Sequence, residues 1–249
     1  MKSISNHQLQ LKLSQQDIRK FSDKRVEYRL GFFNRLMNTC VYMIDYRTRK
    51  LIFADVPCPT ISGFSRDILK QEGFNIYAKI LPPDELQWLQ KMQEESQRIY
   101  FNYSIEERIG LDFYYDLMMT GKGGQSVPIY QRIVPYRLCN AGNIWLALSV
   151  ISAVPFTYKT TKACIDNHVT GERYDFIDDK FVLSKRKHLT QDEVTILRYL
   201  ASGFSLKDAA TEIGTKYRTA LQKETSAFRK LGVTTQAAAV YRANTQGLL

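Results

Sequence analysis

The chain has 249 residues, of which 44% are hydrophobic and 12% aromatic, so it holds enough apolar material for a packed core and is not a basic unfolded tail. Lysine and arginine outnumber acidic residues by 35 to 25, and the resulting net charge of +10 favours an anionic partner such as nucleic acid. No apolar run approaches the roughly 18 residues that span a bilayer, and the N-terminus lacks a continuous apolar signal core. We therefore expect a cytoplasmic protein that binds no membrane.

Residues 1–31 are predicted to form an N-terminal helical segment, because apolar side chains such as Leu9, Ile18 and Leu30 recur on a basic background. Up to Arg35 the chain holds 8 basic and 3 acidic residues. Such a segment could touch DNA or lie on a membrane surface. The simpler interpretation is that it packs on the next domain, or on the same helix of a second copy.

Residues 32–155 have the pattern of one domain made mostly of strands. Two apolar runs, VYMID at 41–45 and LIFA at 51–54, flank a polar turn and predict a β-hairpin. Short helices are expected at 63–69 and from Pro82 on, since proline is well tolerated in the first turn of a helix. Three further strands are predicted between glycine-containing turns, at 113–120, 126–138 and 143–154.

Residues 156–188 are predicted to be a linker that contains a β-hairpin, because strand-like runs at 163–166 and 173–177 surround a Thr-Gly turn. The basic run at 185–188 indicates a solvated hinge, which is also placed to hold phosphates. We expect an ordered connection between two domains.

The sequence gives little support for a metal site, a bound cofactor or enzyme activity. The four cysteines are far apart without a CxxC pair, and only three histidines occur, so neither a zinc cluster nor a disulfide framework is apparent. We expect Cys40, Cys58, Cys139 and Cys164 to be reduced, with no metal and no cofactor bound. The GxSxG, HExxH and GK[ST] patterns of common enzymes are absent as well, so we expect no catalytic residues and no enzyme.

Residues 189–249 predict four helices and carry the most specific pattern of the chain. Thr190 and Glu193 have the spacing of a capping box, and glycines stand between the helices. From residue 185 to the end, 11 basic residues stand against 5 acidic ones, and many of the basic residues fall on the third helix, at about 217–230. A basic third helix behind two shorter ones is typical of a helix-turn-helix DNA-binding domain.

Residues 189–233 resemble the LuxR/GerE-type helix-turn-helix family, since they fit its pattern without a gap. The tail from about Thr235 to Gly247 fits the family's fourth helix, which often pairs subunits. Several positions depart from the family pattern, with small residues where aliphatic ones are usual, so a smaller core is expected. The matching residues are Leu189, Thr190, Glu193, Ile196, Leu197, Leu200, Ala201, Gly203, Ser205, Lys207, Asp208, Ala210, Gly214, Thr219, Lys230, Leu231, Gly232 and Val233.

Residues 32–155 look like a PAS domain, on the strength of GFSRDIL at 63–69, KILPPDE at 79–85 and the Gly142 turn before the last strand. The resemblance implies a five-stranded antiparallel sheet with helices across one face, which serves as a sensing or dimerising module. A different α+β fold that only dimerises is the alternative. Candidate ligand-lining residues, which would equally form an ordinary core, are Tyr42, Ile44, Phe53, Ile76, Tyr77, Met118, Ile133 and Leu146.

Together the two resemblances imply an α+β protein in which a PAS-like domain precedes a four-helix DNA-binding domain. The implied function is sequence-specific transcription regulation by a homodimer on double-stranded DNA, with a small ligand or a partner sensed by the PAS-like domain and RNA polymerase as a further partner. The alternative is a signalling adaptor that binds proteins through both domains and is indifferent to DNA. The resemblance implies that three residues contact base edges, namely Leu221, Gln222 and Thr225. It implies that five others contact phosphates, namely Lys216, Arg218, Thr219, Lys223 and Lys230.

Overall fold

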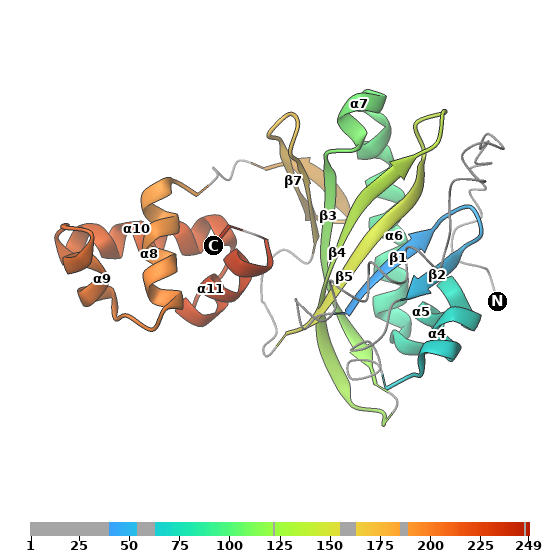
Figure 1. Cartoon of the computed structure of the whole chain (residues 1–249), viewed down its shortest axis with the longest axis horizontal. Coiled ribbons are helices and arrows are strands. Elements are labelled where there is room, and N and C mark those ends of the chain that lie inside the picture. Colours follow the sequence, from blue (N-terminus) through green and yellow to red (C-terminus); the bar gives the residue numbers. More distant parts are fainter. Residues whose placement is uncertain (1–39, 54–62, 122, 155–162, 185–188, 247) are drawn as a thin grey trace. The chain divides into compact units, whose positions relative to one another are not determined.

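The computed structural model describes residues 40–53, 63–121, 123–154, 163–184, 189–246 and 248–249. They form two compact units, a sheet unit up to residue 184 and a helical unit from residue 189 on (Figure 1). The fold is therefore α+β, as expected. The helical segment predicted at 1–31 lies outside the described residues.

The sheet unit is built on eight antiparallel strands in the order β2-β1-β5-β4-β3-β6-β7-β8 (Figure 1). The predicted hairpin and the three predicted longer strands form its first five members. Three more strands continue the sheet beyond β3, because residues 111–115 of β3 pair with β6. The sheet thus has eight strands where five were expected. Its strands are β1 (Cys40–Asp45), β2 (Lys50–Phe53), β3 (Leu111–Thr120), β4 (Ser126–Leu138), β5 (Ile144–Ala153), β6 (Ala163–Asn167), β7 (Arg173–Ile177) and β8 (Lys180–Leu183).

Helices lie across one face of this sheet (Figure 1). The longest, α6, has Pro83 at its first position, where the missing N–H is harmless, and buries Leu89, Met92 and Ile99 at helical spacing. Ser65 caps the first described helix by accepting the N–H of Ile68. The helices of this unit are α4 (Arg66–Glu72), the short 3₁₀ helix η1 (Gly73–Asn75), α5 (Ile76–Ile80), α6 (Pro83–Phe101) and α7 (Ile105–Arg108).

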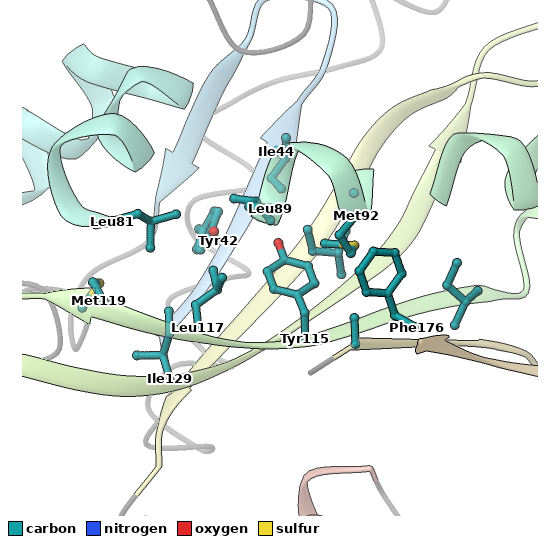
Figure 2. Packing of buried hydrophobic residues seen from close by; sticks show 14 of the residues in the cluster. Tyr42, Ile44, Leu81, Leu89, Met92, Tyr115, Leu117, Met119, Ile129 and Phe176 are labelled. Atoms are coloured by element: carbon teal, nitrogen blue, oxygen red, sulfur yellow. The ribbon is translucent and has the colours of Figure 1, made fainter. Parts of the chain in front are cut away.

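The main core lies between the helices and one face of the sheet. Strand alternation places Tyr115, Leu117 and Met119 of β3 in the same buried cluster as Leu89 and Met92 of α6 (Figure 2). A second, smaller cluster belongs to the other face of β1, β2 and β5. Its buried members are Val41, Met43, Ile52, Trp145 and Leu146.

The last strands of the sheet are fastened to α6. The rings of Trp88 and Phe176 meet edge to face with their centroids 5.8 Å apart, and Lys91 Nζ lies 2.8 Å from a carboxylate oxygen of Asp179. Arg98 donates a hydrogen bond of 3.3 Å to the carbonyl of Phe181. The segment 163–184, which we predicted to be part of a linker, therefore packs as part of the sheet unit.

The expectation that all four cysteines are reduced is wrong. Cys40 takes part in a disulfide bond, whereas Cys139 and Cys164 are buried and form no disulfide. We expected all four to be reduced because they lie far apart in the sequence. Sequence separation is no guide here, since folding brings distant cysteines together and connectivity cannot be deduced from spacing.

The helical unit contains α8 (Gln191–Ala201), α9 (Leu206–Glu212), α10 (Tyr217–Leu231) and α11 (Gln236–Thr245), the four helices predicted. Gly232 ends α10 in a left-handed conformation, with φ of 69°, which residues with a side chain rarely adopt. The N–H of Val233 then bonds the carbonyl of Phe228 at 3.0 Å, which closes a Schellman-type cap and turns the chain toward α11.

Candidate nucleic-acid interface

The start of α8 is fixed by a reciprocal cap. The Thr190 hydroxyl accepts the backbone N–H of Glu193, and the Glu193 carboxylate accepts the N–H of Thr190 at 2.7 Å, so the predicted capping box is present. At α9, the Ser205 hydroxyl likewise accepts the N–H of Asp208. These caps satisfy N–H groups that have no partner inside the helix, and they set where each helix begins.

Small side chains let α8, α9 and α10 approach closely. Ala209, Ala220 and Ala227 are completely buried, as are Ile196 and Leu197 of α8, and the three helices contact one another in pairs. The inner face of α10 is therefore taken up by helix-helix contact, as the alanine-rich sequence predicted.

The outer surface of α10 collects most of the residues predicted to touch DNA. Leu221, Gln222 and Thr225 are exposed and lie within one turn of each other. Lys216 and Arg218 are exposed at the start of the helix, while Thr219 and Lys223 are half-buried. The structure thus places base-reading and phosphate-holding candidates on one continuous surface.

Two of the predicted phosphate ligands have partners inside the unit. Lys223 forms an ion pair with Asp192 at the surface. Lys230 is much less exposed, and its Nζ donates to a Glu193 carboxylate oxygen at 2.6 Å. Burial opposes ionisation of Glu193, but hydrogen bonds from Lys230, the Thr190 backbone and Ser226 outweigh it, so the pKa of Glu193 is lowered. Lys230 therefore connects α10 to the cap of α8.

The inner stripe of α10 includes one acidic residue that the sequence analysis did not single out. Glu224 is 9% exposed among the buried residues of this helix. Burial raises the pKa of Glu224, because it disfavours the charged form. Its spacing of four residues from Ala220 could have located it on the inner face.

The candidate ligand residues of the sheet unit come together only in part. Tyr42, Ile44, Ile76 and Ile133 are buried in the main core, and Tyr77 packs against it. Met118 is a neighbour of Leu117 and Met119 and so points to the opposite face of β3. Leu146 belongs to the smaller cluster on that other face. The Phe53 side chain lies outside the described part of the chain.

A buried polar network lies within this core, and the sequence analysis missed its central residue. Gln131 is fully buried, and its amide nitrogen lies 2.9 Å from Tyr42 Oη, 3.0 Å from Tyr77 Oη and 2.9 Å from Ser149 Oγ, so three hydroxyl oxygens share its two N–H groups. The Tyr42 and Tyr77 hydroxyl oxygens are 2.9 Å apart. Burial raises the pKa of Tyr42, Tyr77 and Tyr115, so all three phenols stay neutral. The sequence did hold a signal for Gln131, namely a polar residue at a position of β4 that strand alternation points into the core.

Neither a metal cluster nor a membrane-spanning helix occurs among the described residues. No group of three or more His, Cys, Asp or Glu side chains in that part of the chain is arranged to hold a metal ion. None of the helices described there is both long enough and apolar enough to cross a membrane.

No protein-family model matches the chain, and no curated protein matches it. Among solved structures, phage VqmA in complex with DPO is 13% identical over 93% of this chain and 91% of that chain, with a TM-score of 0.32. The VqmA-ligand-DNA complex of Vibrio cholerae is 15% identical over 92% of this chain and 89% of that chain, with a TM-score of 0.33.

Two further structures extend the comparison. Escherichia coli SdiA is 10% identical over 93% of both chains, with a TM-score of 0.27. The response regulator ChrA is 29% identical over 26% of this chain, with a TM-score of 0.26, and the match spans only 33% of the ChrA chain. All of these TM-scores lie below 0.5.

Proposed function

We propose that the chain is a sequence-specific, DNA-binding transcriptional regulator with a LuxR/GerE-type helix-turn-helix domain behind a PAS-like domain. The observation that carries the proposal is the surface of α10. Its inner face is buried within the helical unit, and its outer face presents Arg218, Gln222 and Arg229 to solvent. An exposed helix of this character fits the major groove, where its polar side chains meet base edges and its cations meet phosphates.

The residues of α10 divide into candidates for contact with bases and candidates for contact with phosphates. Gln222 is the best candidate for base recognition, since its amide can bond adenine through a donor and an acceptor at once. Lys216, Arg218 and Thr219 are placed to hold phosphates. Lys223 can exchange its surface ion pair with Asp192 for a phosphate, because exposed pairs are weak. We assign Lys230 a positioning role, since its ammonium already binds Glu193.

For the sheet unit we propose a dimerising and sensing role. The support is chemical: three phenol hydroxyls, the Ser149 hydroxyl and one amide lie inside a mainly apolar core, and small-molecule sites combine apolar walls with few polar groups in this way. Tyr42, Tyr77 and Gln131 would orient a small ligand, with Ile44 and Ile133 as apolar walls. Pairing of two chains would present two copies of α10 to two half-sites.

The test is selection of bound fragments from the chain's own genome, with sequencing at two salt concentrations. We expect an enriched two-fold motif, and an affinity that falls steeply with salt because lysine and arginine release counterions from the phosphates. The Arg218→Ala variant should lower the salt slope by about one. An adaptor that only binds proteins would select no motif, and its weak binding would respond little to this change.

A further inference from the structure

Two large apolar side chains stand on the exposed surface of α10. Tyr217 is 53% exposed and Leu221 is 40% exposed. They are four residues apart, so they are neighbours along one side of the helix, about 6 Å apart along its axis. We call this pair the apolar stripe.

Both side chains keep a large part of their surface in water, whereas the α10 residues that are buried in the helical unit are Ala220, Glu224, Ala227 and Leu231. Burial of exposed apolar groups against a partner contributes favourable free energy to binding, and on a helix that is otherwise polar and basic such groups indicate a binding surface.

The neighbours of the stripe identify the partner. Arg218 follows Tyr217, Gln222 follows Leu221, and both are exposed, so cationic and amide groups flank the stripe. Thr225 continues the same side of the helix, and its hydroxyl donates to the Leu221 carbonyl at 2.8 Å. That proton is therefore no longer available to a base. A surface with a cation, an amide and an apolar stripe side by side suits the major groove of DNA.

The major groove presents one apolar substituent at the base edges, the 5-methyl group of thymine. We propose that Tyr217 and Leu221 recognise thymine methyl groups, so that the binding site carries A·T pairs at the positions that the stripe contacts. This inference rests on the proposed function, and it adds the base that the helix prefers beside the adenine read by Gln222.

The experiment uses the full chain and the site obtained by selection, synthesised with thymidine or with deoxyuridine at single positions. Deoxyuridine lacks only the methyl group and keeps base pairing. Burying one such carbon contributes ~0.8 kcal/mol, so the wild type should bind about fourfold more weakly for each contacted methyl removed. Leu221→Ala should weaken binding to the thymidine site and should lose the sensitivity to deoxyuridine at one position.

Matched variants separate the ring of Tyr217 from its hydroxyl and the stripe from its neighbours. Tyr217→Phe should keep the response to deoxyuridine, Tyr217→Ala should lose it at a second position, and Gln222→Ala should keep it at both. The salt dependence of Leu221→Ala should match that of the wild type, because no charge is removed.

The experiment distinguishes failure of this inference from failure of the proposed function. If the wild type binds a selected motif but does not discriminate thymidine from deoxyuridine, the inference is wrong while the proposed function stands. If no motif is selected at all, the proposed function itself fails. If Leu221→Ala changes the sedimentation coefficient of the free protein and leaves DNA preference unchanged, the stripe pairs protein chains and the inference is again wrong.

Discussion

The ammonium of Lys230 in α10 lies 2.6 Å from the carboxylate of Glu193 in α8. The same carboxylate also accepts the N–H of Thr190, so one side chain caps the first helix of the unit and holds the third. The position of the proposed DNA-binding helix thus depends on a contact that the DNA itself would not touch.

Replacing Lys230 by Met should destabilise the helical unit, because it leaves the buried Glu193 carboxylate with one partner fewer. A hydrogen bond to a charged group contributes about 1.5–3 kcal/mol, so amide hydrogen exchange in α8 and α10 should speed up accordingly. Arg229→Met is the matched control, since Arg229 is the exposed neighbour. Equal exchange rates in the two variants would show that the ion pair adds no stability.

The lowered pKa of Glu193 gives the helical unit a pH dependence of definite sign. The ionised carboxylate is favoured by folding, so its contribution is fully present above the ordinary value of 4.5 and is lost as the pH falls through the lowered folded value. Hydrogen exchange of α8 and α10 measured from pH 6 down to pH 3 should reveal this loss. Glu193→Gln should be less stable at pH 6 and should lack that part of the pH dependence.

Glu224 should behave in the opposite way. Burial raises its pKa, so the charged form weakens folding above the folded pKa, and this penalty disappears as the carboxyl is protonated. Glu224→Gln should therefore slow amide exchange in α10 at pH 7, and wild type and variant should converge near pH 4. A variant that is less stable at pH 7 would mean that the charged form has a stabilising partner.

Gln222 and Lys223 are adjacent in the sequence but should affect DNA binding differently. Gln222→Ala should relax the preference at one base pair by about 1–3 kcal/mol, because it removes a bidentate contact to a base edge. Lys223→Ala should weaken binding to every sequence alike and reduce the salt slope. Titration of matched and mismatched duplexes distinguishes the two, and an equal loss on every duplex from Gln222→Ala would contradict its role.

Gln131→Met should destabilise the sheet unit by about 1–3 kcal/mol, because the buried hydroxyls of Tyr42, Tyr77 and Ser149 lose the amide group that they contact. Urea unfolding followed by tryptophan fluorescence reports on this unit alone, since both tryptophans, Trp88 and Trp145, belong to it. Ser126→Ala, at an exposed position of the same strand, should leave the midpoint unchanged. A midpoint for Gln131→Met equal to that control would rule out a structural role for the network.

Local signals in the sequence predicted most of the elements. The Thr190 and Glu193 capping box, Pro83 at the start of α6 and the glycines between helices all depend on backbone groups a few residues away. Such short-range chemistry can be inferred from spacing alone. The four helices of the helical unit and the first five strands were predicted for this reason.

Contacts between distant segments could not be inferred in the same way. Alternation along β3 shows that Leu117 and Met118 face opposite sides, but it does not tell which side meets the helices, and our assignment of Met118 took the wrong side. The pairing of β6 with β3, the disulfide at Cys40 and the bond between Lys230 and Glu193 likewise join residues that only the folded chain brings together.

The pairing of β1 with β5 has a consequence for how the molecule is made. Cys40 lies opposite Ile151, so the centre of the sheet cannot close until most of its unit has left the ribosome. The helical unit needs no such partner, because its helices follow one another directly along the chain. Mean sequence separation of contacts governs folding speed, so we expect the helical unit to fold faster than the sheet that precedes it. The helical unit, which leaves the ribosome after the sheet unit, would then complete its structure in the shorter time.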